Sequence, residues 1–175
     1  MFQVFENFLN DNEKIQIENG MLAHDFPWFF SPITGGVITK NVKESSQLVH
    51  LFYDINYNII SNAFENVKNI FNKTKINYKK FIRIKANMTS NITNLKKEEH
   101  GPLHQDVPKD NYKSFIYYVN DSDGDTIFFD NDYNIINRFT PKRGTGILFN
   151  SNLFHCSSNP IINEKRIVIN YIFEN

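Results

Sequence analysis

The chain has 175 residues, a length that suits one domain with a substantial buried core. Its 19 basic and 19 acidic residues cancel, so no overall electrostatic field favours nucleic acid or an anionic membrane as a partner. Cys156 is the single cysteine, which excludes an intrachain disulfide and favours a reducing cytoplasm. The first residues lack the pattern of a secretory signal, and no apolar stretch reaches membrane-spanning length. We therefore expect a cytoplasmic protein without a membrane partner.

Aromatic residues cluster in the segment Asp25-Phe-Pro-Trp-Phe-Phe30. The proline in this segment opposes a continuous helix. Two interpretations stay open: an aromatic plug that closes one end of the core, or a lid that faces a substrate.

The strongest helical periodicity runs from about residue 46 to 72. Apolar residues recur there at steps of three and four, and Ser45 or Ser46 is suited to cap the start. The apolar positions are Leu48, Val49, Phe52, Ile55, Ile59, Ile60, Ala63, Val67, Ile70 and Phe71. The pattern predicts a helix over 46–72, which needs a sheet to lie against.

From about residue 80 the period changes to that of short strands separated by turn residues. Asp123-Gly124 and Arg143-Gly144 fall where tight turns are needed. Strands are predicted over 81–89, 114–120, 126–130, 133–139, 145–150 and 166–173, and two more segments carry His104 and His155. A run of many short strands indicates a sandwich or barrel.

The residues with the most specific chemistry are His104 and Asp106, which form a His-x-Asp pair, and His155. On an extended strand, side chains two residues apart project from the same face, so one metal can bind both members of the pair. His155 follows the predicted strand 145–150, where an adjacent jelly-roll strand could deliver a third ligand. Two histidines and one carboxylate suit one face of an octahedral Fe(II), leaving the opposite face open to a chelating co-substrate and O2. The alternative for His155 is a core histidine bonded to the backbone.

Arg166 stands eleven residues beyond His155, at the start of an apolar run that ends at Phe173. A buried guanidinium without a partner costs on the order of several kcal/mol, so an arginine pointing into an apolar barrel implies an anion beside it. Its planar fork suits a carboxylate, which it can grip with two hydrogen bonds. The alternative is a surface ion pair with Glu164, which shares its strand parity.

Together these residues resemble the Fe(II)- and 2-oxoglutarate-dependent oxygenases, most closely the prolyl 4-hydroxylase-like branch, over roughly residues 80 to 175. Other parts of the resemblance are Phe115-Ile-Tyr-Tyr-Val-Asn120, Gly124-Asp-Thr-Ile-Phe128, Pro141 and the segment 144–149. The resemblance implies that His104, Asp106 and His155 are the catalytic iron ligands. It also implies that Arg166 and Tyr118 bind the far carboxylate of 2-oxoglutarate.

The resemblance implies a fold as well: mainly β with flanking α, a double-stranded β-helix (jelly roll) with N-terminal helices packed on the major sheet. We expect a single domain over 1–175, with an N-terminal helical and aromatic support region at 1–78 and the catalytic core at 79–175. The implied reaction is hydroxylation of a substrate C–H bond, using O2 and 2-oxoglutarate and releasing succinate and CO2. The expected substrate is a protein side chain such as proline, or a small metabolite. Nucleic acid is not expected, because Ile172 stands where base-repair demethylases of the superfamily carry a second arginine.

Two departures from the family pattern bear on the co-substrate. Val168 stands where many relatives have Ser or Thr, and the tyrosine that some relatives place shortly before His-x-Asp has no counterpart. Asn87 is a candidate donor to the metal-bound end of 2-oxoglutarate. The loop 107–113 and the cluster 26–30 are candidates for contacting the substrate.

Two other functions stay open. One is a cupin-type metalloprotein that does not use 2-oxoglutarate, because His155-x-x-x-Asn159 fits part of a cupin motif; Asp106 and Arg166 do not fit it. The other is a non-catalytic jelly-roll binding domain. Among the remaining features, the acidic segment 121–125 is interpreted as a solvated hairpin and not as a calcium loop, since its sixth position is Thr126. Cys156 has the opposite parity to His155 and is expected to point away from the metal.

Overall fold

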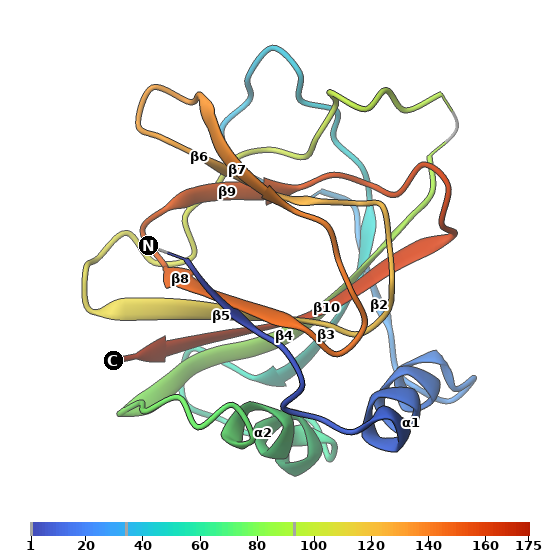
Figure 1. Cartoon of the computed structure of the whole chain (residues 1–175), viewed down its shortest axis with the longest axis vertical. Coiled ribbons are helices and arrows are strands. Elements are labelled where there is room, and N and C mark those ends of the chain that lie inside the picture. The colour runs from blue at the N-terminus through green and yellow to red at the C-terminus, as the bar shows by residue number, and fades with distance from the viewer. Residues whose placement is uncertain (1, 34, 93) are drawn as a thin grey trace.

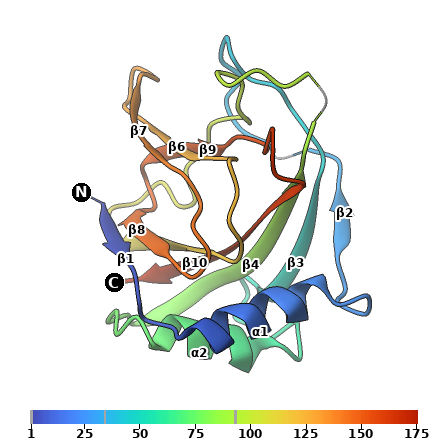
Figure 2. The same cartoon turned by 45° about the vertical axis from the view of Figure 1, so that its right-hand side comes forward.

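The computed structural model describes residues 2–33, 35–92 and 94–175. Two antiparallel sheets face each other, and two helices cover the outer face of the larger sheet (Figure 1; Figure 2). The larger sheet has the strand order β1-β8-β5-β10-β4-β3-β2, and the smaller one has the order β7-β6-β9. The elements are β1 Gln3–Phe5, α1 Asp11–Leu22, β2 Phe29–Ser31, β3 Gln47–Tyr53, α2 Phe64–Asn72, β4 Lys80–Ser90, β5 Tyr112–Tyr118, β6 Thr126–Phe129, β7 Ile135–Phe139, β8 Gly146–Asn150, β9 Phe154–Ser157 and β10 Lys165–Glu174.

The predicted mainly β fold, with helices on the major sheet, is confirmed. Six predicted strands correspond to β4, β5, β6, β7, β8 and β10, and His155 lies on β9. His104 and Asp106 were predicted to lie on one extended strand, and this prediction is wrong. His104 forms an isolated bridge with His155, and Asp106 lies in the bend that follows. The division at residue 79 stays a prediction. The first 78 residues supply β1, β2 and β3 to the same larger sheet.

Alternation along the central strands gives the larger sheet an apolar outer face and a more polar inner face. On β10, Ile167, Ile169 and Tyr171 belong to the outer core cluster. The residues between them face the space between the sheets and line a pocket there, as do alternate residues of β4. These inward-facing residues are Arg166, Val168 and Asn170 on β10 and Arg83, Lys85, Asn87 and Thr89 on β4.

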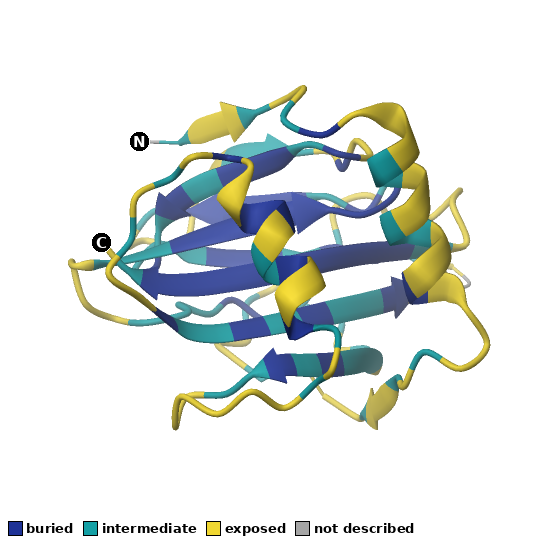
Figure 3. Ribbon diagram, turned by 90° about the horizontal axis from the view of Figure 1, so that it is seen from below, coloured by how far each residue is buried: buried dark blue, intermediate teal, exposed yellow. Residues whose placement is uncertain are grey.

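The outer core is closed by the two helices, which lie across the larger sheet (Figure 3). Asn10 caps α1 in a reciprocal capping box with Glu13, which satisfies backbone donors at the helix start. Helix α2 buries Phe64, Val67, Ile70 and Phe71. Burial of one such side chain stabilises the fold by roughly 1.5–3 kcal/mol. No helix in the described ranges is both long enough and apolar enough to cross a membrane.

The single helix predicted over 46–72 is wrong. The segment forms β3, a turn and then α2. Asp54 accepts hydrogen bonds from the backbone N–H groups of Asn56 and Asn58, and Tyr57 has a positive φ of 66°, so the chain turns there. The periodicity misleads because a spacing of four residues, as between Leu48 and Phe52, is shared by a helix face and a strand face.

The aromatic cluster 25–30 divides in two. Phe26 and Trp28 pack against the outer core, and the indole N–H of Trp28 donates to the carbonyl of Met21 at 2.9 Å. Phe29 and Phe30, on the short edge strand β2, are 61% and 69% exposed. Phe26 and Trp28 therefore match the plug interpretation. The lid interpretation gains no support, because the pocket between the sheets is lined by other segments.

Candidate metal centre

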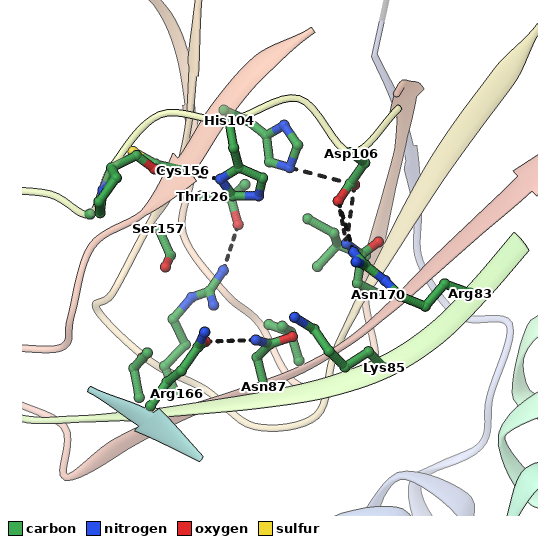
Figure 4. A pocket seen from close by; sticks show the side chains of 17 residues that line it. Arg83, Lys85, Asn87, His104, Asp106, Thr126, Cys156, Ser157, Arg166 and Asn170 are labelled. Carbon is green, nitrogen blue, oxygen red and sulfur yellow. Dashed lines mark hydrogen bonds and ion pairs between the residues drawn. The ribbon is translucent and has the colours of Figure 1, made fainter. Parts of the chain in front are cut away.

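The two sheets bring the His-x-Asp pair and the distal histidine together. One ligand atom each from His104, Asp106 and His155 can be chosen so that all three lie within 4.8 Å of one another. Reciprocal backbone hydrogen bonds of 2.9 Å join His104 to His155 and hold the loop against β9. Asp106 Oδ2 lies 3.6 Å from His155 Nε2. The side chains of His104 and Asp106 lie on the same side of the pocket (Figure 4).

Hydrogen bonds fix which nitrogen of each imidazole is free. His155 Nδ1 lies 2.9 Å from the carbonyl oxygen of Leu153, and His104 Nδ1 lies 3.4 Å from that of Pro102. A carbonyl only accepts, so Nδ1 carries a proton in both bonds, and in the neutral form of either ring Nε2 has the lone pair. Histidine ligands of metals are commonly oriented in this way.

The Asp106 carboxylate is held from three directions. Ser114 Oγ donates to Oδ2 at 2.7 Å, and Asn170 Nδ2 lies 3.1 Å from each carboxylate oxygen. Arg83 Nη2 lies 3.3 Å from Oδ1. These bonds come from β5, β10 and β4, so the larger sheet orients a ligand that belongs to a loop.

The protonation states of the cluster suit a metal. Burial, together with His155, lowers the pKa of His104 to about 4. Burial by itself would raise the pKa of Asp106, but the two histidines, Arg83 and Ser114 hold it at about 2. At neutral pH His104 is therefore a neutral imidazole and Asp106 a carboxylate, the forms that coordinate a cation. Two nitrogens and one oxygen donor fit Fe(II).

Arg166 is only 3% exposed and lies in the same pocket. Its Nε donates to the carbonyl of Gly124 at 2.8 Å, and Nη2 donates to Thr126 Oγ1 at 2.7 Å. Within the described ranges the guanidinium makes no ion pair, and burial lowers its pKa. The alternative of a surface pair with Glu164 is wrong, since that side chain is 92% exposed and lies near Lys165 instead. A buried cation whose protein partners are neutral calls for an anionic ligand.

Thr126 joins Arg166 to Tyr118. The Tyr118 hydroxyl donates to Thr126 Oγ1 at 2.9 Å, so this oxygen accepts from both residues and keeps its own proton free to donate. Burial raises the pKa of Tyr118 to about 12, which leaves the phenol neutral. Tyr118 is therefore connected to Arg166 through the hydroxyl of Thr126. The sequence contained the signal in its Gly-x-Thr-x-Phe segment, but no role followed from it until β6 and β10 were placed.

Gly124 is required by close packing against the arginine. A Cβ at this position would lie 2.7 Å from the carbonyl oxygen of Ser158 and 3.0 Å from Cδ of Arg166. Any side chain would therefore disturb the guanidinium or the loop beside it. Opposite Arg166 in the ladder is Thr89, whose buried hydroxyl has no hydrogen-bond partner in the described part of the chain. It is available to a ligand of the pocket.

The other sequence candidates lie as follows. The amide of Asn87 donates to Gln47 Oε1 at 2.6 Å, and Val168 pairs with Asn87 in the ladder. Cys156 is buried in a cluster with Leu103, Ile127 and Phe129. Asp123 accepts backbone hydrogen bonds from residues 161, 162 and 163, as a loop cap would.

Sequence reasoning did not single out Arg83, Lys85 and Asn170, which line the pocket beside the triad. Strand parity indicated that Arg83 and Lys85 face the same way, and Asn170 shares the parity of Arg166. Parity does not say which other segment those side chains meet.

The chain has the fold of the Fe(II)- and 2-oxoglutarate-dependent oxygenases. A 2OG-Fe(II) oxygenase family oxidoreductase from Burkholderia pseudomallei matches with a TM-score of 0.70 at 13% identity, over 99% of this chain and 84% of that one. A prolyl-4-hydroxylase from Pseudomonas putida matches at 0.65 and 11% identity, over 99% and 92% of the two chains.

A prolyl hydroxylase from Trichoplax adhaerens, in complex with a hypoxia inducible factor oxygen degradation domain peptide fragment, matches at 0.65 and 13% identity, over 99% of this chain and 83% of that one. No family model and no curated protein sequence matches the chain. The resemblance to this superfamily and to its prolyl-hydroxylase branch is thus confirmed for the fold.

Proposed function

We propose that the protein is an Fe(II)- and 2-oxoglutarate-dependent dioxygenase that hydroxylates a substrate C–H bond and releases succinate and CO2. The observation that carries the proposal is a buried arginine without a charged partner in the described chain, in one pocket with a His-Asp-His cluster. His104, Asp106 and His155 would hold the iron. Arg166, with Thr126 and Tyr118 behind it, would bind the far carboxylate of 2-oxoglutarate.

Bound iron would supply the activation of O2 and the oxidative decarboxylation of 2-oxoglutarate. The chain's own residues position the reactants and exclude water. Ser114, Asn170 and Arg83 orient the Asp106 carboxylate. The rings of Phe128 and Phe149 lie 5.8 Å and 4.8 Å from that of His155, so the distal histidine is walled by apolar groups. Fixed hydrogen-bond partners of this kind hold the charges of a site in place with little reorganisation.

The proposed substrate is a protein side chain, such as proline, or a small metabolite. A peptide is supported by the Trichoplax adhaerens neighbour, which was solved with a peptide fragment. Nucleic acid receives no support, because the chain carries no net charge. We also propose that residues 1–175 act as a single domain and that the protein is cytoplasmic, as its single cysteine suggests.

The test is to add Fe(II) and 2-oxoglutarate to metal-free protein without oxygen and to record the visible spectrum. The proposal expects a weak charge-transfer band that needs both additions and is lost in Arg166→Ala and His155→Ala. Bound iron without the band would favour a cupin-type metalloprotein, which has no use for Arg166. Absence of bound iron would favour a non-catalytic jelly-roll domain.

A further inference from the structure

Strand β4 points two cations into the pocket, and neither is needed to hold 2-oxoglutarate in the proposal above. Lys85 is half-buried and makes no hydrogen bond or ion pair within the described residues. Arg83 reaches Asp106 with one nitrogen at 3.3 Å, and its buried Nε has no partner in the same ranges. Figure 4 shows both side chains entering the pocket from β4.

The position of Lys85 separates it from the arginine clamp. In the ladder between β4 and β10, Arg166 pairs with Thr89, whereas Lys85 pairs with Asn170. Four residues of strand separate the two rows, about 13 Å at roughly 3.3 Å per residue. Asn170 is also the residue that holds Asp106. The backbone of Lys85 therefore lies in the ladder row of Asn170, which holds Asp106, four residues along β4 from the row of Arg166.

The charges of the filled pocket do not cancel. A divalent metal, the Asp106 carboxylate and dianionic 2-oxoglutarate together carry one negative charge, which Arg166 balances. Arg83 and Lys85 then remain as two positive charges beside the metal. Two uncompensated cations on the wall of one pocket attract negative charge, so the complete site favours a further anion.

We propose that the substrate is a compact acid whose carboxylate or phosphate group binds Lys85, with Arg83 beside it, and so brings a neighbouring carbon to the metal. This inference rests on the proposed function. It favours a small acid because Lys85 lines the pocket in the same ladder row as Asn170, the residue that holds the Asp106 carboxylate.

The electrostatics of Lys85 are consistent with this role. Burial and the nearby Arg83 lower its pKa to about 8, against the opposing influence of Asp106. Positive charge thus prevails around this amine. An anion bound there would stabilise its protonated form.

The experiment uses the full chain loaded with Mn(II), which is stable in air, and has two calorimetric stages. The first measures the affinity for 2-oxoglutarate of the wild type, Lys85→Met, Lys85→Arg and Lys80→Met. The second titrates each loaded protein with inorganic phosphate and, separately, with acetate, at constant ionic strength. Lys80 is the matched control, because it lies on the same strand but at the surface, near Glu174.

The expected result is unchanged 2-oxoglutarate affinity in all four proteins, with saturable binding of phosphate or acetate that weakens at least tenfold in Lys85→Met. Lys85→Arg should keep most of the anion binding, and Lys80→Met should keep all of it. The better-bound anion would indicate whether the substrate carries phosphate or carboxylate.

Three outcomes would overturn the inference. Anion binding that is absent in the wild type, or unchanged in Lys85→Met, would remove the anion subsite. A tenfold loss of 2-oxoglutarate affinity in Lys85→Met would assign Lys85 to the co-substrate. Failure of the wild type to bind 2-oxoglutarate would refute the proposed function, and the inference with it. This failure appears in the first stage, whereas failure of the anion subsite alone appears in the second.

Discussion

Replacement of Arg166 by methionine separates the stability of the fold from the binding of the co-substrate. The change removes two hydrogen bonds, to Gly124 and Thr126, each worth roughly 1.5–3 kcal/mol for a charged donor. It also removes a buried cation that lacks a charged partner in the described chain, a relief on the order of several kcal/mol. The two effects oppose each other, so the free energy of unfolding of the metal-free protein should stay within about 2 kcal/mol of the wild type.

The effect on 2-oxoglutarate binding should be much larger. A fork of two charge-assisted bonds to a carboxylate is worth roughly 3–6 kcal/mol, which corresponds to at least about a hundredfold rise in Kd. At a 2-oxoglutarate concentration of about 100 times the wild-type Kd, binding stabilises the wild type by about 2.7 kcal/mol. The variant should gain only about 0.4 kcal/mol under the same conditions. At roughly 2–4 °C per kcal/mol, 2-oxoglutarate should raise the Tm of the wild type by about 5–11 °C and that of Arg166→Met by about 1–2 °C.

The assay is thermal unfolding of Mn(II)-loaded protein with and without 2-oxoglutarate. Arg143→Met is the matched control, because that arginine is at the surface and pairs with Glu18 at 3.1 Å. The control should keep the full shift. If Arg166→Met bound metal and kept its 2-oxoglutarate affinity within threefold of the wild type, the buried arginine would not be the carboxylate clamp.

Three further predictions concern the metal and the clamp. Asp106→Ala should abolish metal retention and all 2-oxoglutarate consumption, measured by metal analysis and succinate release; full consumption in the variant would show that the ligand assignment is wrong. Gly124→Ala should weaken 2-oxoglutarate binding by about tenfold or more, since the new methyl group would meet Cδ of Arg166 at 3.0 Å; calorimetry that finds wild-type affinity would contradict the role of this close approach. The stability of the metal-free protein should be highest above about pH 6.5 and should fall as the pH is lowered towards 4, because the unfolded chain protonates His104 in this range while the folded chain, with a pKa of about 4, does not. By pH 5 the loss should be about 2 kcal/mol in urea unfolding, and His104→Gln should reduce this slope; an identical slope in the variant would exclude His104 as its source.

Local sequence determined much of the chemistry. The residues alone predicted an Arg166 that points into the barrel and six strands after residue 80. The types and order of His104, Asp106 and His155 predicted a metal site, because few other roles need those donors together. These features depend on residue type and short-range spacing, which are the same however the segments pack in the folded protein.

Tertiary structure decided what those side chains meet. The predicted helix 46–72 became β3, a turn and α2, because the spacing of Leu48 and Phe52 fits both periods and only a neighbouring strand selects one. Thr126 connects Tyr118 to Arg166 only because β6 lies opposite the larger sheet. Lys85 entered the proposed anion subsite only when β4 was placed beside β10 and the loop of Asp106. These contacts join residues that are far apart in the chain. They are therefore determined by the packing of the two sheets and not by the local sequence pattern.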